Sequence, residues 1–98
     1  MTEIEKLAEI LRDLHDVGVR HLGNATVRET FRERVVWDGV VEIFAVMGHA
    51  TATQAFAWSY ETDDGSRRYV AVLNIPPVTS PVEAVRASIV ADSLAGRR

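Results

Sequence analysis

The chain has 98 residues, a formal net charge of −3 and no cysteine. A chain of this length buries about two thirds of its unfolded surface, so residues 1–98 are expected to form a single domain. The missing cysteines exclude disulfide scaffolds, thiolate nucleophiles and zinc sites built on sulfur. Mild acidity argues against a nucleic-acid partner, because such proteins carry a basic surface. No apolar run suits a membrane span or a secretion signal, which predicts a cytoplasmic protein with no membrane partner.

The first segment is expected to be an amphipathic helix. Its apolar residues recur at three- and four-residue steps, namely Ile4, Leu7, Ala8, Leu11 and Leu14. Thr2 and Glu5 have the spacing of a capping box, and Gly18 is of the type that often ends a helix. The charged opposite face is typical of a helix that docks on a core; a partner-binding helix is the alternative.

After this segment, apolar and polar residues alternate with a period of two, which predicts four strands joined as an antiparallel meander. We expect these strands over residues 27–36, 40–47, 53–61 and 67–75. Asp38-Gly39 and Asp64-Gly65 are turn signals within the first and second hairpins. The first strand has an alternative, because Thr26 and Glu29 also have the spacing that caps a short helix.

A two-residue turn at Asp64-Gly65 places Tyr60 opposite Tyr69 and Trp58 opposite Ala71. One face of this hairpin is then aromatic and bulky, and the other face is small. The bulky face is expected to fill a core, while the small face admits something close.

Two loop lengths are possible for the first hairpin. A three-residue loop with Gly39 as the bulge residue separates apolar from charged residues on the two faces better than a two-residue loop does. This register places Val40, Phe44 and Val46 together on an apolar far face. A helix, a ligand or a second copy of the chain must cover such a face, and we rank the second copy first. These three residues are therefore interface candidates.

The last element is predicted as a helix from Ser80, its N-cap, to about residue 94. Pro81 stands at the first helical position and Glu83 at the third, which are strong local signals. One side carries a stripe of large apolar residues and the other carries small ones, Ala84, Ala87, Ser88 and Ala91. A helix with two weakly polar sides is usually covered on both, so Ala87 and Ala91 are further interface candidates. The elements together predict a two-layer α+β domain.

Histidines are the side chains that titrate near neutral pH. His15, Asp16 and His21 lack the one-turn spacing of metal ligands on a helix, so we predict no metal and no cofactor. His49 follows Gly48 in the loop between the second and third strands, where it is a candidate general base. The competing interpretation, which we prefer, is that His49 caps backbone groups in a turn.

Trp58, Tyr60 and Tyr69 have polar tips that need partners when buried, so they are candidates for lining a small-molecule pocket. At strand spacing, aromatic residues more often belong to a core. No nucleophile elbow, phosphate-binding glycine loop or zinc-protease motif is present in the sequence.

The sequence resembles a set of short bacterial proteins with no established activity. The resemblance lies in the pattern VWDGVVEIF over residues 36–44, followed by Gly48-His49 and by AFAWS over residues 55–59. It implies a self-contained domain and transfers no site. The order of elements is also similar to the double-stranded-RNA-binding domain, but residues 80–83 (SPVE) stand where that family carries a lysine cluster.

The sequence therefore predicts a noncatalytic binding protein that acts as a homodimer through an apolar sheet or helix face. The alternative is a small-molecule-binding protein or a minor enzyme with a pocket between sheet and helices. That alternative uses His49 as the base and Trp58, Tyr60 and Tyr69 as the lining.

Overall fold

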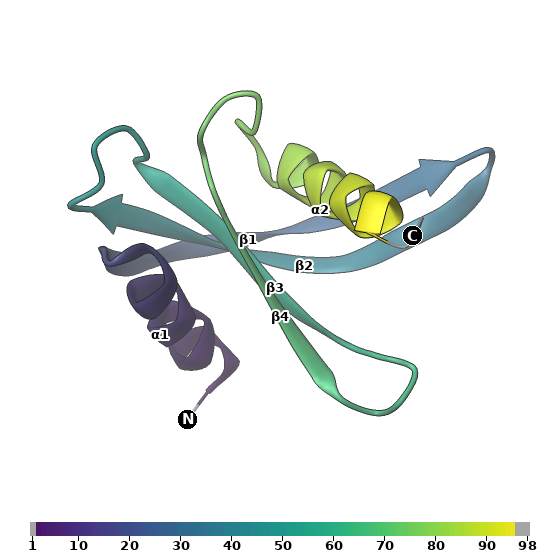
Figure 1. The fold of residues 1–98 in the computed structure, drawn as a ribbon, viewed down its shortest axis with the longest axis horizontal. Coiled ribbons are helices and arrows are strands. Elements are labelled where there is room, and N and C mark those ends of the chain that lie inside the picture. Colours follow the sequence, from purple (N-terminus) through teal and green to yellow (C-terminus); the bar gives the residue numbers. More distant parts are fainter. Residues whose placement is uncertain (1, 96–98) are drawn as a thin grey trace.

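The computed structural model describes residues 2–95 and has two helices and four strands (Figure 1). In chain order these are α1 (Glu3–His15), β1 (Gly18–Phe31), β2 (Arg34–Met47), β3 (Gln54–Glu61), β4 (Arg67–Leu73) and α2 (Pro81–Ala95). The strands form one antiparallel sheet in the order β1-β2-β3-β4. The α+β class, the meander and the positions of both helices in the chain are confirmed.

The helices lie on opposite faces of the sheet (Figure 1), so the expectation of a two-layer domain is wrong. Strand β3 shows why. Ala55 and Ala57 are buried with α1, whereas Phe56 and Trp58 are buried with α2. Successive strand residues point to opposite faces, and β3 is apolar on both, so one helix layer would have left half of it uncovered.

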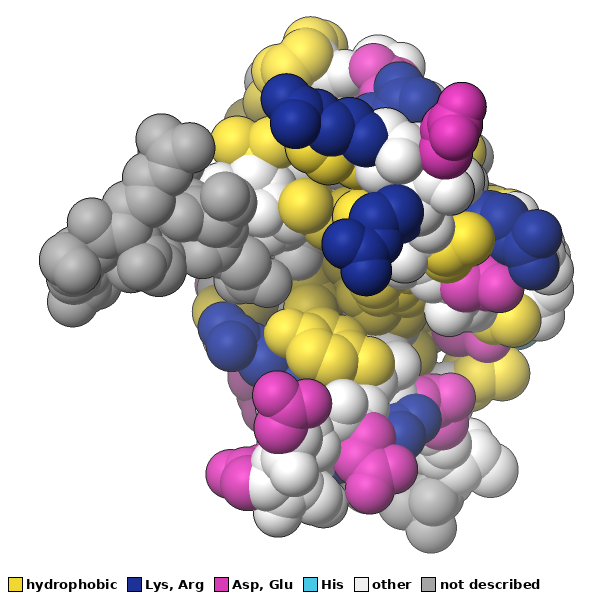
Figure 2. All heavy atoms as spheres, turned by 90° about the vertical axis from the view of Figure 1, so that its right-hand side faces the viewer, with side chains coloured by type: hydrophobic (Ala, Val, Ile, Leu, Met, Phe, Trp, Pro, Cys, Tyr) yellow, Lys and Arg dark blue, Asp and Glu magenta, His cyan; other side chains and the backbone are white. Residues whose placement is uncertain are grey.

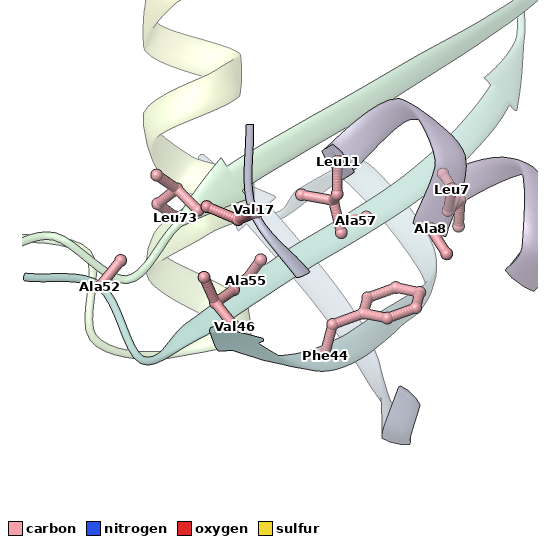
Figure 3. Close-up of a cluster of buried hydrophobic side chains, with 10 residues drawn as sticks. All are labelled: Leu7, Ala8, Leu11, Val17, Phe44, Val46, Ala52, Ala55, Ala57 and Leu73. Atoms are coloured by element: carbon pink, nitrogen blue, oxygen red, sulfur yellow. The ribbon is translucent and has the colours of Figure 1, made fainter. Parts of the chain in front are cut away.

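The α1 cluster is the core between α1 and its face of the sheet (Figure 3). Leu7 and Leu11 are fully buried there, beside Phe44 of β2. The predicted cap is confirmed, because the Glu5 backbone N–H donates to Thr2 Oγ1 over 3.1 Å. The helix ends earlier than Gly18 suggested: Asp16 takes the left-handed conformation, with φ of 53°, and its N–H donates to the Arg12 carbonyl.

The α2 cluster occupies the other face and includes Val27, Val41, Phe56, Trp58, Ala84 and Val85. The predicted N-cap is confirmed by the Glu83 backbone N–H, which donates to Ser80 Oγ over 3.3 Å. Trp37 packs edge-on against Trp58 with their ring centroids 5.9 Å apart. The Trp37 ring also covers Gly39, where an added Cβ would lie 3.0 Å from its Cη2 atom.

The first hairpin differs from the prediction. Its turn is at Arg32-Glu33, and Asp38-Gly39 lies inside β2, paired with Arg28 and Val27. Both turn residues have positive φ, 52° and 66°, although neither is glycine or asparagine. That conformation costs about 1–2 kcal/mol per residue, and pairing along the full length of β1 and β2 outweighs it. Strand β1 is consequently much longer than expected and begins at Gly18.

The second hairpin is at the expected place with its register shifted by one residue. Tyr60 pairs with Arg68, and Tyr69 pairs with Ser59. The reason is a five-residue loop over residues 62–66, in which the Thr62 N–H donates to the Ser66 carbonyl over 2.8 Å. The Asp64 carboxylate accepts from the Ser66 N–H over 2.9 Å, so the aspartate stabilises a wider loop than a two-residue turn.

Candidate functional site: a groove along strand β4

A groove of about 400 Å³ lies beside β4, the last strand of the sheet. We call it the β4–α2 groove. Its lining residues come from α1, β3, β4 and α2: Leu14, Tyr60, Arg68, Tyr69, Val70, Ala71, Val72, Ala87, Ser88 and Ala91. Arg68 is the one charged side chain among these lining residues, so the surface that the groove presents is mostly apolar.

The groove exists because α2 packs mainly over β1 and β2, so that β4, at the edge of the same face, is only partly covered and its Val70 and Val72 are half-buried. Figure 2 shows the consequence, with apolar side chains on the floor of a hollow between the β1–β2 hairpin above and the β3–β4 hairpin below. Small residues of α2, Ala87 and Ala91, stand over the groove. Because these side chains are small, they leave space beside α2 for another element. A leucine or phenylalanine at either position would fill that space.

Besides Arg68, which lines the groove, charged groups lie on the adjoining surface. Arg67, at the start of β4, forms an ion pair of 3.4 Å with Glu3 of α1. In the adjoining hairpin loop, a hydrogen bond from the Thr62 hydroxyl is the main cause that lowers the pKa of Asp64 to about 2. Asp64 is therefore ionised at neutral pH, and the β3–β4 loop stays acidic.

The groove brings together residues from both predicted sets. The groove is lined by Tyr60 and Tyr69, predicted to line a ligand pocket, and by Ala87 and Ala91, predicted as interface residues. Trp58 does not join them, because it is only 2% exposed and belongs to the α2 cluster. The prediction that Trp58 lines a pocket is corrected: the aromatic face is packed core at this position.

The predicted far-face interface is not a free surface. Phe44 and Val46 are buried beneath α1 of the same chain, with Phe44 0% exposed. The burial of these residues by α1 was not predicted from the sequence, because both helices were expected on one face of the sheet. Val40 lies beyond the reach of α1 and remains 48% exposed.

His49 lies far from the groove. Its ring Nδ1 accepts hydrogen bonds from the backbone N–H groups of Thr51 and Ala52, over 3.1 and 2.9 Å. This is the turn-capping role. The loop precedes β3, whereas Tyr60 stands near the other end of that strand, about 20 Å away at strand rise. The structure therefore does not bring His49 together with Tyr60 and Tyr69, as the alternative function requires.

A histidine–carboxylate pair that the sequence did not reveal lies beside α1. His21 Nε2 is 2.8 Å from Glu42 Oε1, and the His21 ring packs edge-on against Phe44. Glu42 is the buried charged residue of the described chain. Such a pair can orient an imidazole for proton transfer, but the shallow groove at His21 is lined by no hydroxyl or thiol among the described residues. Strand register brings the pair together, and no local signal shows it.

His15 is packed at the end of α1 and its Nε2 has no hydrogen-bond partner among the described residues. Burial, with a smaller contribution from the nearby His49, lowers the pKa of His15. Within residues 2–95, no group of three or more histidine, aspartate or glutamate side chains could hold a metal ion. His15, Asp16 and His21 accordingly do not form a cluster.

The comparisons with known proteins give no family. No protein-family model matches the chain, and no curated protein or solved structure is significantly similar to it. In the described part of the chain, neither helix has the length and apolar character needed to cross a membrane. The resemblance to short bacterial proteins and the cytoplasmic location stay predictions.

Proposed function

We propose that this protein is a noncatalytic interaction protein that forms a homodimer through the β4–α2 groove. The observation that carries the proposal is the combination of a half-buried apolar strand surface, at Val70 and Val72, with the small residues Ala87 and Ala91 of α2 beside it. Exposed apolar surface of this kind is typical of protein–protein contacts.

The exposed residues around the groove support a macromolecular partner. Leu14, at the groove margin, is 64% exposed, and Val90 on the outer side of α2 is 56% exposed. Both are large apolar side chains that the chain's own core does not use. A partner that seats in the groove removes Leu14 from water, which favours association by about 25 cal/mol for each Å² of apolar surface buried.

A small molecule fits the groove less well than a second chain. Ligand sites usually enclose most of their ligand, whereas this groove lies open to solvent at the edge of the sheet. The groove also lacks a metal cluster or an oriented histidine among its lining residues. Its lining supplies apolar area and hydrogen-bonding edges, which suit a polypeptide.

The test is the solution mass of the full chain by light scattering, over a wide range of concentration. We expect the wild type to reach twice the mass of one chain. Ala87→Arg places a long charged side chain in the groove and should weaken dimerisation at least about tenfold, which corresponds to 1.4 kcal/mol.

Val40→Arg is the matched control, because Val40 is an exposed apolar residue outside the groove. This variant should dimerise as the wild type does. A wild type that stays monomeric at every concentration contradicts the proposal, and so does a dimer that Val40→Arg dissociates and Ala87→Arg leaves intact.

A further inference from the structure

We infer that β4 is the dimer contact itself: it pairs antiparallel with β4 of a second copy, which joins two four-stranded sheets into one of eight strands. This inference rests on the proposed function, because it specifies how the second copy occupies the β4–α2 groove. It concerns the backbone of β4, whereas the proposal above concerns the side chains around it.

The hydrogen bonds of the hairpin show which backbone groups of β4 are free for pairing. Asn74 donates its N–H to the Gln54 carbonyl over 3.0 Å, and the Thr62 N–H donates to the Ser66 carbonyl. Both bonds continue the register that pairs Ala55 with Leu73. In an antiparallel ladder, hydrogen-bonded residues alternate with residues whose N–H and C=O point away. The even-numbered residues of β4 therefore bond to β3, and the odd-numbered ones face the open edge.

The outward-facing residues of β4 are Arg67, Tyr69, Ala71 and Leu73. Each offers one donor and one acceptor at the edge of the sheet. Under a two-fold axis such a row is complementary to itself, because donors of one copy meet acceptors of the other. The free edge of β4 therefore matches a second β4 without any change in the strand.

The two edges of the sheet differ in how they are protected. Strand β1 has a bulge at Leu22, where the register shifts between His21 and Gly23, and it carries Arg20 and Arg28. Bulges and charges are the usual devices that prevent a strand from joining another sheet. Strand β4 keeps one register along its whole length and has no charge from Tyr69 to Leu73. Its edge is open to pairing.

The space beside β4 suits a strand. On one face of the sheet the β4–α2 groove ends at Leu14, and on the other it ends at Ala87 and Ala91. An added strand lies about 4.8 Å from β4, so its side chains reach both margins. Tyr69 of the second copy can cover Leu14, while Val70 and Val72 of that copy meet the small face of α2.

Charge selects the antiparallel direction. Arg67 and Arg68 stand at the start of β4, and the neutral residues Leu73 and Asn74 stand at its end. Parallel pairing would place arginines of the two copies side by side, which is destabilising. Antiparallel pairing about the middle of β4 separates the two arginine pairs by about 20 Å, at the rise of a strand.

Amide hydrogen exchange of the wild-type chain, resolved by residue, tests the inference. At concentrations where light scattering shows a dimer, the Tyr69 and Ala71 amides should exchange at least about tenfold more slowly than in dilute monomer. The Val70 and Val72 amides serve as internal controls. They bond to β3 in both states and should be protected throughout.

Ala71→Pro provides a second measurement. It removes an outward N–H and leaves the bonds to β3 in place, which an edge strand tolerates. We expect it to lower the dimer affinity at least about tenfold, as Ala87→Arg does. If the wild type dimerises while its Tyr69 and Ala71 amides stay unprotected, strand pairing is wrong and the homodimer stands. If the wild type is monomeric, the proposed function fails as well.

Discussion

Helices α1 and α2 cover opposite faces of one sheet, and α1 covers its face more completely than α2 does. Helix α1 has one apolar stripe, with Leu7 and Leu11 fully buried, and a charged side in solvent. Helix α2 buries Ala84 and Val85 but leaves Ala87, Val90 and Ala91 exposed. A sharply amphipathic helix completes its side of the domain. A helix that is apolar on two sides leaves a surface that a second chain can use.

The largest loss of stability is expected from a substitution in the α1 cluster. Leu11→Ala removes a fully buried side chain from the α1 cluster and should lower the free energy of unfolding by about 3 kcal/mol. Urea denaturation measures the change. Leu14→Ala is the matched control on the same helix when both variants are measured at concentrations where the chain is monomeric, because Leu14 is 64% exposed in the single chain. Equal losses in the two variants would mean that α1 is not docked as described.

A smaller loss is expected under α2. Gly39→Ala places a Cβ 3.0 Å from the Trp37 ring, which must shift from its contact with Trp58. We expect the free energy of unfolding to fall by about 1–3 kcal/mol, with a change in the near-ultraviolet circular dichroism of the tryptophans. Gly18→Ala is the control, since its nearest neighbour would be at an ordinary 3.6 Å. A spectrum and stability like those of the wild type would show that Trp37 does not need Gly39.

The smallest expected effect is a pH dependence at the end of α1. Burial holds the pKa of His15 below its ordinary value, so the folded chain takes up this proton less readily than the unfolded chain. Stability should therefore be unaffected well above pH 6.5 and should decline as the pH falls below the unfolded pKa of about 6.5. His15→Gln should flatten that decline in urea denaturation series at several pH values. An unchanged slope would remove His15 as its source.

Local signals predicted the parts of the fold that depend on neighbours in sequence. Thr2 and Ser80 cap their helices as expected, because an N-cap and its N–H partner are three residues apart. His49 likewise caps its own loop. The turn of the first hairpin was predicted wrongly at Asp38-Gly39. Gly39 lies within a strand, where it makes room for the Trp37 ring, and the turn is at Arg32-Glu33.

The candidate site was predicted in pieces. Tyr69 and Ala87 were named for different roles, and only the fold shows that they line one groove. The pair of His21 and Glu42 depends on the register of β1 and β2, which no local pattern fixes. The cover of Phe44 by α1 depends on which face each helix chooses, and that follows from the packing of the whole sheet.

A second copy of the chain lying along β4 is the central feature of the proposed dimer. The most direct measurement is an isotope-filtered nuclear Overhauser experiment on a dimer assembled from equal amounts of labelled and unlabelled chains. We predict contacts between the copies from Tyr69 and Ala71 to the opposite β4, and from Val70 to Ala87. Contacts between copies that centre on Val40, with none along β4, would contradict the account.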